Sequence, residues 1–107
     1  MSAYFHLKPS GTQYMFNLKG GNGEVVLTSE RYTTKQSAEG GIASVKVNSP
    51  HDARYDRRSN SAGSPYFVLK AANGEIIGTS EAYSSTAARD GGIAWVKANA
   101  PTAPTRE

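Results

Sequence analysis

The chain has 107 residues, a formal net charge of +3, an isoelectric point near 9.3, and 37% hydrophobic residues. This size suits one hydrophobic core, and no apolar stretch approaches the ~20 residues that span a bilayer. The absence of cysteine excludes disulfides, thiolate chemistry and cysteine-ligated zinc. Because the opening residues also lack the pattern of a secretion signal, we expect a cytoplasmic protein with a single domain over residues 1–107.

The sequence carries an internal duplication. A shift of 51 positions aligns residues 15–50 with residues 66–101 without a gap, and 18 of the 36 aligned pairs are identical. This similarity predicts two halves with the same fold, over about residues 4–50 and 55–101. Residues 102–107 are predicted to be a tail or a short edge strand.

The first predicted element is a strand over residues 4–8, where Phe5 and Leu7 fall on one face of an alternating pattern. The shift of 51 positions aligns this strand with residues 55–59. In the second copy, Asp56 and Arg58 stand where the first has Phe5 and Leu7. The second copy is therefore predicted to be an edge strand whose charges protect it from aggregation.

A hairpin follows in each half. Residues 16–19 alternate apolar and polar side chains, residues 24–29 are rich in β-branched residues, and Asn22-Gly23 lies between them. The same arrangement recurs over residues 67–80 with Asn73-Gly74. Asn-Gly pairs suit a type I′ turn, in which both central residues have positive φ.

Helical spacing comes next, with Ala38, Ile42 and Val45 along one face of the first predicted helix. Ile93 and Val96 line the second helix in the same way. We predict that both helices end before the prolines at 50 and 101, and that the N-caps are Thr33, in a capping box with Gln36, and Ser84.

Each predicted helix contains a Gly-Gly pair, at residues 40–41 and 91–92. Glycine costs a helix interior roughly 1 kcal/mol relative to alanine. The repeated cost predicts a close approach of the helix backbone to the sheet. An anion-cradling loop is the alternative, although the preceding strand and the lysine of a phosphate-binding loop are missing.

These elements predict an α+β fold. Two tandem β-β-β-α repeats would form a single, mainly antiparallel sheet with two helices packed on one face. The predicted core consists of Phe16, Leu18, Ile42, Val45, Phe67, Leu69, Ile93 and Val96.

Three blocks occur in both halves: Leu-Lys-x-x-Asn-Gly-Glu, Thr-Ser-Glu-x-Tyr, and Gly-Ile-Ala-x-Val-Lys-x-Asn. In these blocks the chain resembles the YegP-like family. The resemblance implies β-β-β-α units assembled into one sheet with exchange of terminal strands, and it implies that a tandem chain is an internal pseudo-dimer. It implies no activity, cofactor or catalytic residue, because that family is functionally uncharacterised.

The repeated polar segments are the candidate ligand site. The hypothesis is that hydroxyls and carboxylates of both copies bind a small ligand, through Ser29, Glu30, Tyr32, Ser80, Glu81 and Tyr83. The alternative is structural: serine bonds the backbone, glutamate favours the helix dipole, and tyrosine packs over the core edge. We favour the structural interpretation, because a strand–helix junction needs such residues in any case.

A nucleic-acid surface is a second hypothesis, since basic and aromatic residues interleave at Arg54, Tyr55, Arg57 and Arg58. Asp52 and Asp56 dilute this charge. Alternation along a strand would also send Arg57 and Arg58 to opposite faces of the sheet.

The two histidines, His6 and His51, have no ligand spacing, so we predict no metal site. Trp95 replaces Ser44 in the second half, either to cover the core rim or to anchor a partner. We predict a small non-catalytic binding or protein-interaction module without a cofactor. Nucleic-acid binding is the second candidate, and an enzyme that uses the two Ser-Glu-x-Tyr segments is the third.

Overall fold

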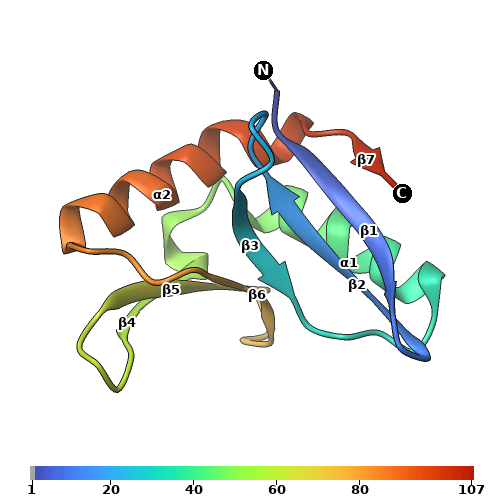
Figure 1. Cartoon of the computed structure of the whole chain (residues 1–107), viewed down its shortest axis with the longest axis horizontal. Coiled ribbons are helices and arrows are strands. Elements are labelled where there is room, and N and C mark those ends of the chain that lie inside the picture. The colour runs from blue at the N-terminus through green and yellow to red at the C-terminus, as the bar shows by residue number, and fades with distance from the viewer. Residues whose placement is uncertain (1) are drawn as a thin grey trace.

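The structure is a computed structural model that describes residues 2–107. Within them lie one seven-stranded sheet and two α-helices (Figure 1). The strands are β1 (Tyr4–Ser10), β2 (Gln13–Lys19), β3 (Val25–Ser29), β4 (Tyr55–Ser59), β5 (Pro65–Lys70), β6 (Ile76–Ser80) and β7 (Thr105–Arg106). The helices are α1 (Lys35–Asn48) and α2 (Thr86–Asn99), each followed by a short 3-10 helix, η1 (Asp52–Arg54) and η2 (Ala100–Thr102). The predicted α+β fold with a single sheet is confirmed.

The two halves meet at the centre of the sheet, whose strand order is β4-β5-β6-β3-β2-β1-β7. Thr28 of β3 lies opposite Thr79 of β6 in antiparallel register, and these residues are equivalent in the two repeats. A pseudo-twofold axis therefore passes between them, perpendicular to the sheet, and relates α1 to α2 on the same face. The sheet is strongly twisted, so that β1 is seen nearly face-on in Figure 1 while β5 is seen edge-on.

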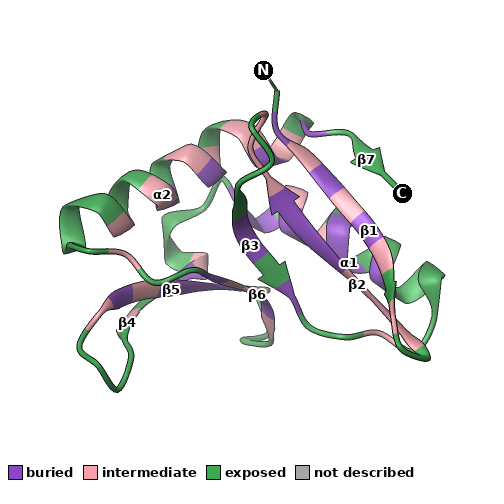
Figure 2. Cartoon of the chain, viewed as in Figure 1, coloured by how far each residue is buried: buried purple, intermediate pink, exposed green. Residues whose placement is uncertain are grey.

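One continuous hydrophobic cluster joins both halves. All eight predicted core residues are buried, and the strands bring inward Phe5, Leu7 and Leu27 as well. Figure 2 shows the buried positions concentrated on the central strands and on the helix faces that contact them. Neither helix, at 14 residues each, is long and apolar enough among the described residues to cross a membrane.

The β2–β3 and β5–β6 hairpins exist, but the predicted type I′ turns are wrong. Gly23 and Gly74 have positive φ, while Asn22 and Asn73 do not. In the first turn the N–H of Gly23 donates to the carbonyl of Gly20 over 2.9 Å, and the N–H of Gly20 donates to the carbonyl of Glu24. This pattern is a type I turn followed by a glycine bulge, and each asparagine side chain accepts a hydrogen bond from the glutamate N–H two residues on.

The alignment of β1 with β4 requires a correction of one residue. Phe5 pairs with Leu18, and Tyr55 pairs with Leu69, which is the equivalent of Leu18. Tyr55 therefore replaces Phe5 in the core, and Arg57, not Arg58, replaces Leu7. The segment from Tyr55 to Leu69 is one residue longer than the equivalent segment from Phe5 to Leu18, and this insertion shifts the register. β4 is nevertheless an edge strand that carries charged residues, as predicted.

The helix N-caps lie one residue later than predicted. Thr34 caps α1 by accepting a hydrogen bond from the N–H of Ser37, and Ser85 caps α2 by accepting one from Ala88. Thr33 and Ser84 are exposed residues that precede the caps. The predicted capping box of Thr33 and Gln36 is therefore wrong. The helices end at Asn48 and Asn99, before the prolines, as predicted.

The two edges of the sheet are built differently. After α1 the chain enters the second half with β4, which pairs with β5 of the same half as β1 pairs with β2. After α2 it crosses to the first half, where β7 lies parallel to β1. The N–H of Phe5 donates to the carbonyl of Pro104 over 2.8 Å, just before β7 begins. Of the exchange of terminal strands that the resemblance implies, the structure therefore shows one crossing, that of β7.

Candidate functional site

The two motif serines are structural. The hydroxyl of Ser29 accepts a hydrogen bond from the N–H of Phe16 over 2.9 Å and donates one to the carbonyl of Glu30. Ser80 makes the equivalent bonds with Phe67 and Glu81. Both serines are buried, so their hydroxyls satisfy backbone groups at the strand–helix junction and are not presented to a ligand.

The rings of the two motif tyrosines explain why one residue of each Gly-Gly pair has no side chain. Tyr32 stacks on Phe16 and Tyr83 on Phe67, with ring centroids 6.2 and 6.3 Å apart. A Cβ on Gly41 would lie 2.7 Å from the Cζ of Tyr32, and one on Gly92 would lie equally close to the Cζ of Tyr83. The close neighbour of the helix backbone is thus a tyrosine ring from the preceding loop. The prediction named the sheet as the partner, and this is wrong for the nearest contact: only Gly41 also meets a sheet side chain, with Cε2 of Phe16 3.0 Å from an added Cβ.

The structure does not bring the two Ser-Glu-x-Tyr segments into one cleft. Because β3 and β6 are antiparallel, the chain continues beyond Ser29 and beyond Ser80 in opposite directions. Tyr32 then bonds the backbone of Tyr14, at the start of β2, whereas Tyr83 bonds that of Pro65, at the start of β5. Glu30 and Glu81 are exposed. Any ligand site therefore uses at most one segment.

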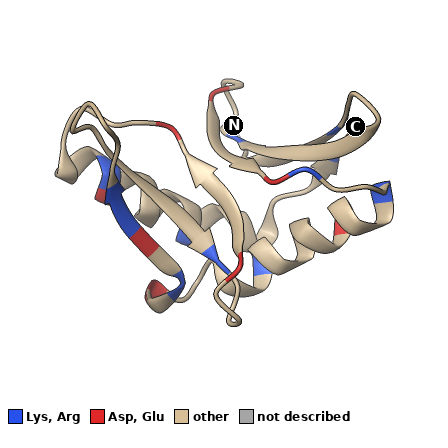
Figure 3. Ribbon diagram, turned by 90° about the horizontal axis from the view of Figure 1, so that it is seen from below, with Lys and Arg blue, Asp and Glu red and all other residues tan. Residues whose placement is uncertain are grey.

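The predicted basic–aromatic cluster is largely neutralised. Tyr55 is buried, and its hydroxyl donates to the carbonyl of Ser49 over 2.7 Å, so its ring is not free to stack on a base. Arg57 pairs with Asp52 and Asp90, and Arg58 on the other face pairs with Asp56. Basic and acidic residues interleave along this part of the chain (Figure 3).

Two aspartates of this cluster, Asp52 and Asp56, are held in their charged form. Hydrogen bonds from Lys97 and Arg57 lower the pKa of Asp52, and hydrogen bonding from Arg58 lowers the pKa of Asp56. Arg54 donates from Nε to Oδ1 of Asn48 over 2.9 Å. A polyanion would have to displace these partners before it gained any contact of its own.

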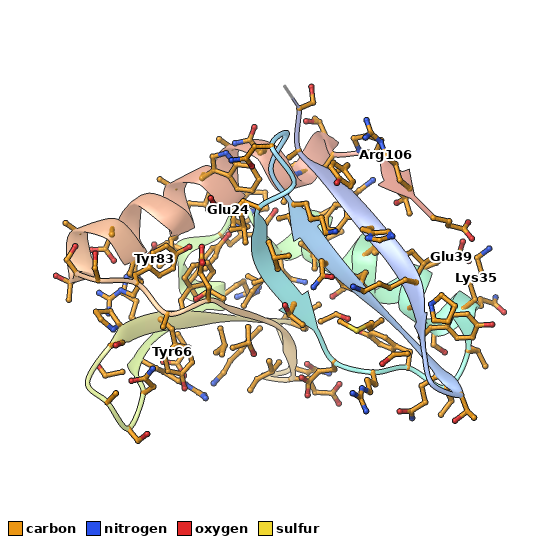
Figure 4. The ribbon with its side chains drawn as sticks, viewed as in Figure 1. Glu24, Lys35, Glu39, Tyr66, Tyr83 and Arg106 are labelled. Carbon is orange, nitrogen blue, oxygen red and sulfur yellow. The ribbon has the colours of Figure 1, made fainter. Side chains whose placement is uncertain are left out.

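A hollow with a volume of about 580 Å³ lies between the halves. The β2–β3 turn forms one wall, and Tyr83 with one face of α2 forms the other. Its lining consists of Gly20, Gly21, Asn22, Glu24, Val26, Tyr83, Gly92, Trp95 and Asn99. Figure 4 shows Glu24 and Tyr83, which come from different halves, beside α2. The indole of Trp95 reaches across to the turn, because a Cβ on Gly20 would lie 3.8 Å from Cζ2 of Trp95.

The hollow has a negative electrostatic character. Its lining includes one carboxylate, Glu24, and no basic residue. Burial raises the pKa of Tyr83, and the carboxylates of Glu81 and Glu24 raise it further. Both carboxylates therefore act on the phenol at the mouth of the hollow. Aromatic rings next to carboxylates form a surface that suits a cationic group.

Sequence reasoning found part of this site and missed the rest. Glu81, Tyr83 and Trp95 were candidate residues, and the structure places them at one location. Asn22 was interpreted only as a turn residue and Glu24 only as the start of the next strand, and Asn99 was not a candidate for binding. Their role depends on the packing of one repeat's turn against the other repeat's helix, which the sequence of a single repeat does not show.

Metal chemistry finds no support here: within residues 2–107, no group of three or more His, Asp or Glu side chains is placed to hold a metal ion. His6 lies on β1, where its Nδ1 is 3.2 Å from Nζ of Lys19. Burial, followed by the charges of Lys19 and Lys8, lowers the pKa of His6. His51 is exposed at the end of the α1–η1 connection.

Two stretches of the chain, residues 10–56 and 60–107, match the domain of unknown function DUF1508. The chain belongs to this family. The first match runs from the end of β1 into β4, and the second from the β4–β5 loop through β7, so each match contains one hairpin, one helix and the start or whole of the strand that follows the helix. The resemblance to YegP-like proteins and the duplication are thereby confirmed.

The relatives cover the whole chain. A UPF0339 protein of Bordetella pertussis is 64% identical over 107 residues, which are 100% of this chain and 96% of the relative. The UPF0339 protein YegP of Escherichia coli K12 is 55% identical over 100 residues, which are 92% of this chain and 91% of the relative. These are uncharacterised proteins, so the function of the family is unknown and membership assigns no activity.

Two solution NMR structures share the fold. A UPF0339 protein from Shewanella oneidensis superposes with a TM-score of 0.91 at 53% identity, over 99% of this chain and 91% of that one. The YegP protein of E. coli, described as of unknown function, gives a TM-score of 0.90 at 51% identity, over 99% and 92%.

Proposed function

We propose that this chain is a small non-catalytic binding module whose ligand enters the hollow between the β2–β3 turn and α2. The observation that carries the proposal is the composition of that hollow. Trp95 and Tyr83 supply aromatic walls, and Glu24, Asn22 and Asn99 supply a few polar groups. An apolar cavity with a few convergent polar groups is the usual form of a ligand site.

The same composition supports binding over catalysis. A tyrosine with a raised pKa, such as Tyr83, stays protonated at neutral pH and is a poor base or nucleophile. The hydroxyls of Ser29 and Ser80 are already committed to backbone groups. The lining supplies no histidine or lysine that would activate a nucleophile.

An NMR titration tests this proposal. A panel of small molecules, each a short apolar stem with a cationic, neutral or anionic head group, is added to the ¹⁵N-labelled protein. We expect chemical-shift changes at the amides of Gly20, Gly21 and Gly92 and at the indole N–H of Trp95. A panel that shifts none of these signals would contradict the proposal.

Trp95→Ser supplies the matched variant, because Ser44 stands at the equivalent position of α1 and shows that the helix tolerates serine there. The variant should fold and should lose the shift changes, since the aromatic wall is gone. Responses that persist unchanged in Trp95→Ser would place the ligand elsewhere.

The proposal also includes the cytoplasmic location that is expected from a cysteine-free chain. Cell fractionation followed by detection with an antibody tests this location.

A second candidate function, binding of single-stranded nucleic acid, is favoured by the outer face of β7, β1 and β2. Alternation places Tyr4, His6 and Lys8 on that face, opposite the buried Phe5 and Leu7. The guanidinium of Arg106 stacks over the ring of Tyr4, 4.5 Å from its centroid. Lys19 lies next to Tyr4 on β2, and residues 1–23 contain no acidic side chain. Stacked aromatic and basic groups on an open sheet face suit bases and phosphates.

This candidate replaces the predicted Arg54–Arg58 surface, whose cations are paired. A fluorescence-anisotropy titration with a short single-stranded oligonucleotide, at two salt concentrations, tests it. We expect affinity to fall with salt and to be lost in a Tyr4→Ala/Arg106→Ala variant. Arg58→Ala, on the same face at the opposite edge, is the matched control and should have little effect. The candidate is rejected if the affinity for the oligonucleotide does not change with salt concentration, or if Arg58→Ala lowers this affinity more than Tyr4→Ala/Arg106→Ala does.

A further inference from the structure

The first half of the molecule shows what contacts the asparagine equivalent to Asn99. At the end of α1, Asn48 donates from Nδ2 to the carbonyl of Ser44, and its Oδ1 accepts a hydrogen bond from Nε of Arg54 over 2.9 Å. Asn48 is buried, at 7% exposure. The guanidinium of Arg54 thus covers this asparagine from η1.

The second half repeats the arrangement without the arginine. Asn99 is the equivalent of Asn48, and its Nδ2 donates to the carbonyl of Trp95 over 2.8 Å, as Nδ2 of Asn48 does to the carbonyl of Ser44. After α2 the chain continues through η2, Ala103 and Pro104, so no arginine returns to Asn99. Asn99 instead lines the hollow and is only partly buried.

The other residues of the two locations correspond one to one. The pairs Glu24 and Glu75, Tyr83 and Tyr32, and Gly92 and Gly41 are identical, while Trp95 replaces Ser44. The pKa of Tyr32 is raised by burial, by Glu30 and by Glu75, as that of Tyr83 is by burial, Glu81 and Glu24. The same acidic and aromatic surroundings therefore exist twice, and one copy already has a guanidinium bound at its asparagine.

We propose that the hollow binds the guanidinium group of an arginine side chain supplied from outside the chain. This inference rests on the proposed function of the hollow and names its ligand. The guanidinium would donate to Oδ1 of Asn99, as Arg54 does to Asn48, and to the carboxylate of Glu24. Its planar face would lie against the indole of Trp95, and its methylene stem would contact Val26.

The chemistry of the lining selects arginine over lysine. A guanidinium has five N–H donors in a planar fork and stacks on aromatic faces, whereas an ammonium is a compact, strongly hydrated charge. A lining with separated acceptors and a flat indole suits the planar group. An anionic ligand would face Glu24 and Glu81 without a basic partner, because no lining residue is basic.

Isothermal titration calorimetry and NMR with defined ligands test the inference. The ligand is arginine blocked as its N-acetyl methylamide, and the controls are the same derivatives of citrulline, which is neutral and nearly isosteric, and of lysine. We expect the arginine derivative to shift the signals of Trp95, Asn99 and Gly20. The citrulline derivative should bind at least about tenfold more weakly, because it lacks the charge and two of the donors.

A pair of variants adds an internal control. Glu24→Gln should weaken binding of the arginine derivative by about tenfold, since it removes one charge-assisted partner. Glu75→Gln makes the same change at the equivalent turn of the other half and should leave the affinity unchanged. Equal losses in both variants would show a general effect of net charge and would overturn the assignment.

The outcomes separate the inference from the proposed function. If citrulline binds as tightly as arginine, or if only a neutral or anionic ligand shifts the signals of the hollow, the guanidinium assignment fails and the binding site stands. If no ligand of either panel shifts these signals, both fail. Free arginine is compared with the blocked form to identify the source: preference for the blocked form indicates a polypeptide side chain, and preference for the free form indicates the amino acid.

Discussion

Leu27 fills the space that a side chain at position 78 would need. A Cβ added to Gly78 would lie 2.7 Å from Cγ of Leu27, and both residues are buried beside the pseudo-twofold axis. They are equivalent positions of the two repeats, and they flank the Thr28–Thr79 pair. The axis therefore has room for one large side chain, and the duplicated sequence supplies one leucine and one glycine.

This relationship predicts a compensating exchange. Gly78→Leu should destabilise the fold by about 1–3 kcal/mol through overpacking, and Leu27→Gly by about 3–5 kcal/mol through a cavity. The double variant Leu27→Gly/Gly78→Leu should be less destabilised than the sum of the two, because the new leucine enters the vacated space. Urea unfolding monitored by Trp95 fluorescence measures all three. Strictly additive losses would contradict the shared space.

The two glycines of each pair should respond in opposite ways to alanine. A Cβ on Gly40 or Gly91 would meet nothing within 4 Å, so Gly40→Ala and Gly91→Ala should stabilise the protein by up to about 1 kcal/mol through helix propensity. Gly41→Ala and Gly92→Ala should destabilise it, because the methyl group would overlap the tyrosine ring. Thermal unfolding of the four variants checks the contrast, and a gain in stability for Gly41→Ala would refute the contact.

Ser29→Ala should cost about 1–3 kcal/mol, because the buried N–H of Phe16 would lose its acceptor. Ser80→Ala should cost a similar amount through Phe67. Neither change should alter ligand binding in the hollow, since neither serine lines it. Chemical denaturation combined with the arginine titration separates the two effects. A loss of affinity without a loss of stability would show that these serines take part in ligand binding.

Stability should decrease at acidic pH through His6. Its pKa in the folded protein is below the ordinary value of 6.5, so the unfolded chain takes up the proton more readily. The stabilising contribution is therefore complete above pH 6.5 and is lost as the pH falls below it. Unfolding free energies between pH 8 and 5 should show a smaller decline in His6→Gln than in the parent protein. His51→Gln, which changes an exposed histidine, is the control and should follow the parent.

The sequence predicted the repeats, the hairpins, the helices and the core because each depends on local pattern. The alternation around Phe16 and the spacing of Ile42 and Val45 are properties of short segments. The turn type was wrong because Asn22-Gly23 fits two turns, and the choice depends on the bulge that the paired strands adopt. The register of β4 was wrong because a single extra residue between Tyr55 and Leu69 is not visible where only Tyr55 matched.

The candidate site was predictable only in part for a related reason. Glu81 and Tyr83 were candidate residues because their segment occurs in both repeats. Trp95 was a candidate because the first repeat has serine at the equivalent position. Their common location depends on α2 packing beside the β2–β3 turn of the other half, which follows from the β3–β6 pairing. No pattern within either repeat encodes that contact. The pairing of Arg57 with Asp90 escaped prediction because α2 supplies the aspartate.

The pseudo-twofold axis between Thr28 and Thr79 has a consequence for how such a protein can diversify. Two identical subunits related by such an axis would carry identical surfaces, so any substitution in one would appear in the other. Joining the copies in a single polypeptide removes that coupling. Arg54 bonds Asn48 in one half while Asn99 lines an open hollow in the other, so the first location can stabilise the fold while the second is left to change.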